Sequence, residues 1–170
     1  MSTKPLAYED KKQDLIINRV FSAAPEKLFQ AWSDPKMIAQ WWGAKTYTTP
    51  VVKIDFRVGG QLLYCMRSPD GQDTWGKGIY KEIVIPSRIV VTDSFADPLG
   101  NTVPASYYGL EEEWPEDLLL TLTFEDFAGK TKFTLIHSGL PTGQMIELTR
   151  TGWNESFDKL DTVLAAKKGK

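Results

Sequence analysis

The chain has 170 residues, a length that suggests one domain large enough to bury a substantial core. Its 20 Lys and Arg and 22 Asp and Glu leave a formal net charge of -2, which argues against a nucleic-acid partner held by bulk electrostatics. One cysteine, Cys65, and one histidine, His137, exclude an internal disulfide and the usual zinc sites. Carboxylate-only calcium or magnesium sites stay open, but no EF-hand spacing occurs, and we expect no metal and no cofactor.

The N-terminal residues contain no apolar stretch of the kind found in signal peptides, and no run approaches 18 apolar residues. We therefore expect no membrane span and a cytoplasmic location. A single domain should span residues 1–170, with 1–13 and 166–170 as flexible ends.

The first elements are a strand and two short helices. Residues 14–21 are rich in Ile, Val and Phe, which is typical of a strand. Pro25 suits the first position of a helix, and Asp34 followed by Pro35 suits the start of a second helix. Gly43 is expected to end that helix.

The second helix closes on "QWWG", with Trp41 and Trp42 side by side. Successive helical residues point about 100° apart, so the two rings cannot face the same way. We expect one ring in the core. The other either covers the sheet edge or surface, or stands at a cavity mouth where it stacks on a ligand.

Strand patterns dominate from residue 50 onward. Four apolar or β-branched runs fall before residue 96, separated by GG, DG and Pro signals, and two more fall near 117–126 and 130–139. Glu82 and Asp93 are carboxylates whose direction the alternation leaves ambiguous. Helical spacing then returns at Ile146, Trp153, Phe157, Leu160 and Leu164, which predicts one helix of about 20 residues.

This order predicts an α+β fold in which a curved antiparallel sheet is covered by the long C-terminal helix. A bent sheet around one helix does not close fully, so we expect a cavity between them. Gly152 falls in the middle of the helix. We favour close packing against the sheet as the reason, and space for a ligand is the alternative.

Residues 96–117 form a long segment with three prolines, two glycines, Tyr107, Tyr108 and Trp114. Loops this long are usually functional or disordered, and aromatic residues argue against disorder. Two roles remain open: a lid over the cavity, hinged near Gly100 and Gly109, or a patch on the exposed sheet edge.

Five segments resemble, in this order, the Aha1 C-terminal-domain-like family of the START/Bet v 1-like group: "RVFSAAPEKLFQAWSDPKMIAQWWG", "IDFRVGGQLLYCM", "GKGIYKEIVIPSRIVVT", "KTKFTLIHSGLP" and "GWNESFDKL". The resemblance runs from about residue 14 to 165. It implies the helix-grip fold, with six to seven strands around the C-terminal helix and two short helices after the first strand.

The resemblance also implies that the internal cavity binds a small hydrophobic or amphipathic ligand, as a carrier or sensor. The family's namesake stimulates the Hsp90 ATPase, so a chaperone partner is one alternative. A cyclase or hydrolase that uses His137 is another, although we favour a non-enzymatic role. We expect a monomer or homodimer.

We expect side chains from the helix pair, the sheet face and the C-terminal helix to line one cavity. Strand and helix parity select Trp42, Tyr64, Leu120, Phe133, Leu135, His137, Trp153 and Phe157. His137 has a side-chain type suited to general base catalysis. A hydrogen-bonded structural histidine is the reading we favour, because no nucleophile motif accompanies it.

Overall fold

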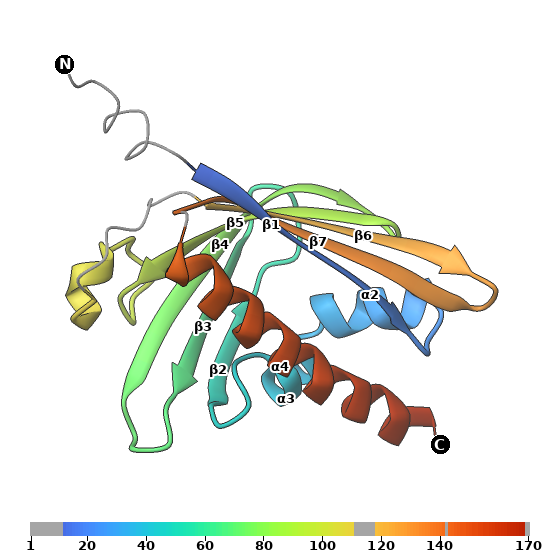
Figure 1. The fold of residues 1–170 in the computed structure, drawn as a ribbon, viewed down its shortest axis with the longest axis horizontal. Helices are drawn as coiled ribbons and strands as arrows, with labels where there is room; N and C mark the ends of the chain where they lie inside the picture. The colour runs from blue at the N-terminus through green and yellow to red at the C-terminus, as the bar shows by residue number, and fades with distance from the viewer. Residues whose placement is uncertain (1–11, 111–117, 142, 169–170) are drawn as a thin grey trace.

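The computed structural model describes residues 12–110, 118–141 and 143–168, which form a seven-stranded sheet with α-helices packed on one face (Figure 1). The elements in chain order are β1 (Lys12–Phe21), α2 (Pro25–Ser33), α3 (Pro35–Trp41), β2 (Thr48–Ile54), β3 (Gln61–Arg67), β4 (Asp73–Val84), β5 (Arg88–Ala96), the 3-10 helix η1 (Ala105–Tyr108), β6 (Leu118–Phe127), β7 (Lys130–Pro141) and α4 (Gln144–Lys168).

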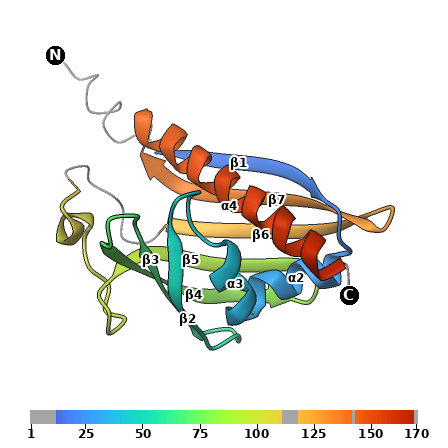
Figure 2. The same cartoon turned by 90° about the horizontal axis from the view of Figure 1, so that it is seen from below.

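The strand order is β1-β7-β6-β5-β4-β3-β2, and every neighbouring pair is antiparallel. The long helix α4 crosses the sheet diagonally, and α2 and α3 lie on the same side of the sheet as α4 (Figures 1 and 2). The helix-grip fold predicted from the sequence is confirmed, including the two short helices after the first strand.

The helix pair begins and ends where the local sequence indicates. Pro25 is the first residue of α2, and Asp34 caps α3 by accepting a hydrogen bond from the Lys36 amide at 2.9 Å. The helix α3 ends at Trp41, with Trp42 as its C-cap residue. Gly43 follows with φ +105, a left-handed backbone angle that glycine adopts without steric cost.

Phe157 of α4 is the centre of the core between the helices and the sheet. Its side chain is fully buried, and its ring lies 5.7 Å from Phe21 of β1 and 5.5 Å from Phe133 of β7. On the other side it meets Trp32 of α2 and Trp41 of α3, at 6.2 and 6.3 Å. These aromatic contacts fix the distance between α4 and this end of the sheet.

The described part of the 96–117 segment contacts both faces of the sheet: Gly100 lies beside the outward-facing Leu63, whereas Leu110 borders the space beneath α4. Leu63 and Cys65 alternate with the inward-facing Tyr64, so they point outward, yet both are buried. Gly100 lies beside Leu63, and the Gly100 carbonyl accepts a hydrogen bond from Lys77 Nζ at 3.0 Å. The lid and the sheet-edge patch both stay predictions, and residues 111–117, with Trp114, lie outside the described part of the chain.

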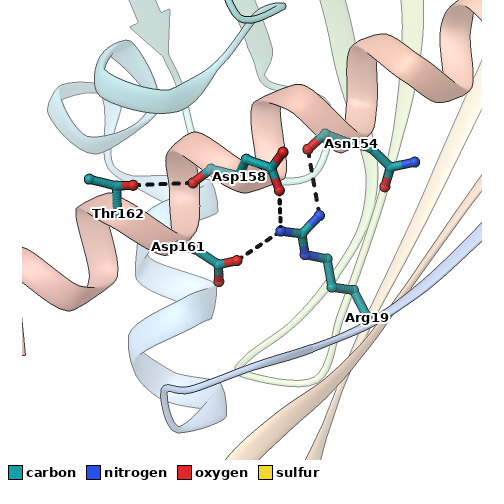
Figure 3. Close-up of polar contacts among 5 residues, drawn as sticks. All are labelled: Arg19, Asn154, Asp158, Asp161 and Thr162. Atoms are coloured by element: carbon teal, nitrogen blue, oxygen red, sulfur yellow. Dashed lines mark hydrogen bonds and ion pairs between the residues drawn. The ribbon is translucent and has the colours of Figure 1, made fainter.

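An ion-pair cluster attaches α4 to the edge strand β1 (Figure 3). Arg19 Nη2 lies 2.6 Å from Asp158 Oδ1 and 2.8 Å from Asp161 Oδ2, and Nη1 donates a longer bond of 3.5 Å to the Asn154 carbonyl. Burial lowers the pKa of Arg19, but the hydrogen bonds and charges of the two carboxylates together outweigh it and raise the pKa above its usual value. The guanidinium also lies 5.9 Å from the Phe157 ring.

Replacing Arg19 by Met keeps the apolar stem but removes the charge. We expect the free energy of unfolding, measured by urea denaturation, to fall by about 1 kcal/mol, and the loss to shrink in high salt. The control is Arg88→Met, which removes a more exposed arginine with a single ion pair, to Glu82 on the neighbouring strand. Equal losses in the two variants would contradict a special role for the Arg19 cluster.

The turn between β6 and β7 contains a strained residue. Ala128 has φ +54 and Gly129 has φ +87, the signs of a type I′ turn, in which Asn-Gly is the preferred pair. We expect Ala128→Asn to raise the free energy of unfolding by about 1 kcal/mol, because Asn tolerates the left-handed region better than Ala. Ala128→Val should lower it, and a shift of both variants in the same direction would refute this explanation.

Candidate functional site: a cavity beneath the C-terminal helix

A cavity of about 440 Å³ lies between the first half of α4 and the strands β3 to β7. Its other wall is the chain that follows α3, from Trp42 to Tyr47. We call it the α4 cavity. It is bounded by Trp42, Gly43, Ala44, Tyr47, Tyr64, Met66, Thr74, Asp93, Ser94, Phe95, Leu110, Leu118, His137, Thr149, Gly152, Trp153 and Ser156.

The eight residues selected from the sequence divide into two groups. Trp42, Tyr64, His137 and Trp153 border the α4 cavity. The others lie in the closed core, where they are at most 2% exposed, and do not border it: Leu120, Phe133, Leu135 and Phe157. Sequence parity selects the correct face of each element but not the position along it, and the aromatic core fills the end of the sheet near α2.

Three aromatic rings form the inner wall of the cavity. The Trp42 ring lies 5.0 Å from Tyr64 and 5.4 Å from Trp153, in tilted and T-shaped arrangements. The two neighbouring tryptophans therefore have separate roles. Trp41 is fully buried in the core and donates a hydrogen bond from Nε1 to the Ala31 carbonyl at 3.1 Å, whereas Trp42 faces the cavity.

The Tyr64 ring can lie flat against β4 because its cross-strand partner is Gly76. A Cβ atom at residue 76 would lie 2.4 Å from Cζ and Oη of Tyr64, much closer than real contacts allow. The hydroxyl of Tyr64 donates a hydrogen bond of 3.2 Å to Asp93 Oδ1. Burial raises the pKa of Tyr64 well above its usual value, and the charge of Asp93 adds to the effect.

His137 lies at the same polar cluster and has protein groups at both ring nitrogens. Nδ1 accepts a hydrogen bond from Trp153 Nε1 at 3.2 Å. Nε2 lies 3.3 Å from Asp93 Oδ2, close enough for electrostatic attraction, but off the direction of a hydrogen bond. An acceptor at Nδ1 requires the neutral imidazole with its proton on Nε2. The histidine is 3% exposed and accepts a hydrogen bond from Trp153, and both features are typical of the structural histidine favoured from the sequence.

The loop wall of the cavity is attached to α4 by polar contacts. Ser156 Oγ accepts a hydrogen bond from the Gly43 amide at 3.0 Å and donates one to the Gly43 carbonyl at 2.8 Å. Lys159 Nζ donates to the carbonyls of Ala44 and Tyr47, both at 3.1 Å. Because these carbonyls hold its ammonium group, Lys159 does not border the cavity.

Gly152 faces the α4 cavity from the middle of the helix. An added Cβ would find no atom within 4 Å, so the close packing favoured from the sequence is wrong at this position. The missing side chain instead contributes to the cavity volume. A glycine in a helix interior costs about 1 kcal/mol relative to alanine, and packing does not compensate for it here.

Asp93 is the main site residue that sequence reasoning left unresolved. The β4–β5 register shifts between Tyr80 and Glu82. Alternation counted along β4 from the buried Tyr80 therefore assigns the residues after the shift to the wrong face of the sheet. Alternation within β5 shows the answer once Val91 is known to be in the core: Asp93 and Phe95 then face inward. Glu82 lies beyond the shift, exposed and paired with Arg88.

Two other chemical possibilities can be assessed in the described residues. Burial raises the pKa of the Cys65 thiol to about 11, which disfavours a reactive thiolate. In the ranges 12–110, 118–141 and 143–168, no three His, Cys, Asp or Glu side chains come together as metal ligands.

No helix within those ranges has both the length and the apolar character that crossing a membrane requires.

The fold defines a helix-grip protein with a pocket beneath its C-terminal helix, and comparisons with known proteins identify its family. The family of Activator of Hsp90 ATPase homolog 1-like proteins matches residues 22–165. The chain belongs to this family. No curated protein is significantly similar to it.

Solved structures of bacterial proteins share the fold along nearly the whole chain. A protein from Chromobacterium violaceum is 26% identical with a TM-score of 0.74, covering 88% of this chain and 95% of that one. A protein from Staphylococcus epidermidis is 27% identical with a TM-score of 0.72, covering 94% and 93%. The AHSA1 protein from Silicibacter pomeroyi is 24% identical with a TM-score of 0.72, covering 91% and 99%.

The contact between Tyr64 and Gly76 gives a test of the cavity wall. Gly76→Ala should displace the tyrosine ring and lower the free energy of unfolding by about 1–3 kcal/mol, the usual cost of overpacking. In a Tyr64→Leu background the same substitution should cost much less, because the clashing ring atoms are absent. Additive effects in this double-mutant cycle, measured by urea denaturation, would show that the ring does not depend on Gly76.

Proposed function

We propose that the protein binds a small amphipathic molecule in the α4 cavity, as a carrier or sensor. The observation that carries this proposal is the cavity itself: about 440 Å³ bordered mainly by aromatic and aliphatic side chains, with polar groups from both the sheet and α4. Small-molecule sites in proteins commonly have this volume and this mixture of surfaces.

Gly152 supports the same proposal. Most residue types at this position would add helix stability, and none of the described side chains needs the space that glycine leaves. A stability cost with no structural compensation is expected where a residue serves a ligand. The cavity is also held open by the aromatic core on one side and by the loop contacts of Ser156 and Lys159 on the other.

The two alternatives have narrower support. The catalytic alternative depends on His137, whose Nδ1 is occupied by Trp153 and whose Nε2 faces a protein carboxylate. A general base needs a nitrogen that can reach the proton of a substrate. The chaperone alternative rests on the description of the family alone.

Filling the cavity from α4 tests the proposed function. Prodan, a neutral dye whose fluorescence shifts to the blue in apolar surroundings, should bind the wild-type protein saturably. Gly152→Leu should abolish this binding, because the new side chain extends into the cavity, while the free energy of unfolding stays equal or rises.

Gly152→Ala is the matched control. It adds only a Cβ, so we expect dye binding to remain and the free energy of unfolding to rise by about 1 kcal/mol. A folded Gly152→Leu protein that binds the dye as the wild type does would place the dye elsewhere. No dye binding by the wild type would argue against an apolar ligand site.

A further inference from the structure

The charge distribution around the α4 cavity indicates which kind of ligand it accepts. Asp93 is the one Asp, Glu, Lys or Arg among the described residues that border the cavity, and its side chain is 20% exposed. The carboxylate is therefore largely shielded from bulk water and lies against a mostly apolar lining. Carboxylates in such positions are normally paired with a cation.

The protein does not supply that cation in the part of the chain that the structure describes. Within this part, His137 is the one basic side chain at ion-pairing distance from Asp93. The hydrogen bond from Trp153 to Nδ1 requires the neutral form of this imidazole, because an imidazolium has no acceptor nitrogen. The described lining of the cavity thus carries one formal negative charge.

Asp93 also keeps acceptor capacity for a ligand. A carboxylate offers about four lone-pair sites. The Tyr64 hydroxyl occupies one of them on Oδ1, and Oδ2 faces His137 Nε2 without an aligned hydrogen bond. The two neighbours hold the carboxylate in place and leave part of it turned toward the cavity.

The neighbouring aromatic wall favours the same kind of group. Tyr64 joins Asp93 directly to this wall, where the Trp42 ring lies 5.0 Å from Tyr64 and 5.4 Å from Trp153. The faces of tryptophan and tyrosine rings attract cations, most strongly when water is excluded. A carboxylate beside such rings is suited to an ammonium group, and unsuited to an anion.

We propose that the ligand of the α4 cavity is an amphipathic organic cation, whose protonated amine pairs with Asp93 while its apolar body lies against Trp42, Met66 and Leu118. This inference rests on the proposed function and names the ligand class for the same site. It gives Asp93 the role of the specificity-determining residue, with Tyr64 and His137 positioning its carboxylate.

Three naphthalene probes separate the two proposals. They carry the same two-carbon chain, which ends in an ammonium, a hydroxyl or a carboxylate group. Binding is measured by isothermal titration calorimetry at neutral pH, where an alkylamine is protonated. We expect the ammonium probe to bind about tenfold more tightly than the hydroxyl probe, and the carboxylate probe to bind most weakly.

Asp93→Asn keeps the shape of the side chain and an acceptor for Tyr64 but removes the charge. The preference for ammonium over hydroxyl should fall to within about twofold, with the hydroxyl probe still bound. Asp126→Asn, the same change at an exposed residue of β6, is the control and should keep the full preference. Gly152→Leu should abolish binding of all three probes, which places them in the cavity.

The outcomes distinguish the failure of each proposal. Equal binding of the ammonium and hydroxyl probes, or tighter binding of the carboxylate probe, would overturn the cation inference and leave the cavity as a ligand site. An ammonium preference that survives in Asp93→Asn would overturn the role of Asp93. If none of the probes binds the folded wild-type protein, the proposed function fails together with the inference.

Discussion

The packing of Phe157 against both the sheet and the helix pair is the constraint on which the rest of the structure depends. This one ring contacts Phe21 and Phe133 of the sheet, and Trp32 and Trp41 of the helix pair. These large rings separate α4 from the strands at Phe157. On the N-terminal side of Trp153, Gly152 has no side chain to fill the space between α4 and the sheet, and the α4 cavity results.

Two glycines leave the space for the cavity. The register between β5 and β6 gives it a charged group. Gly76 allows the Tyr64 ring to lie back against β4, and Gly152 leaves the helix side empty. The pairing of Asp93 with Leu118 sets the face of β5 from which its carboxylate meets Tyr64 and His137. Networks of this kind specify geometry strongly, because a buried polar group without partners is costly. The contacts of Asp93 with Tyr64 and His137 therefore hold the one charged group of the described lining in a fixed position.

The wider family setting explains why the fold alone says little about the ligand. Chains with 24% to 27% identity keep the same architecture, because a helix-grip fold needs only a curved sheet, an apolar helix face and suitable turns. The ligand is decided by residues that the architecture does not require, such as Gly152 and Asp93. Function must therefore be argued from the site rather than from the fold.

Local sequence determined the elements of this protein: Pro25 and Asp34 start the helix pair, alternation marks the strands, and the spacing of Trp153, Phe157 and Leu160 predicts α4. These signals act between residues close in the chain. The tertiary structure alone decided which inward-facing residues border the cavity. Trp153 and Phe157 lie on one helix face, but Phe157 is fully buried in the aromatic core, whereas Trp153 and Gly152 border the cavity. It also decided the direction of Asp93, because strand register depends on partners far away in the sequence.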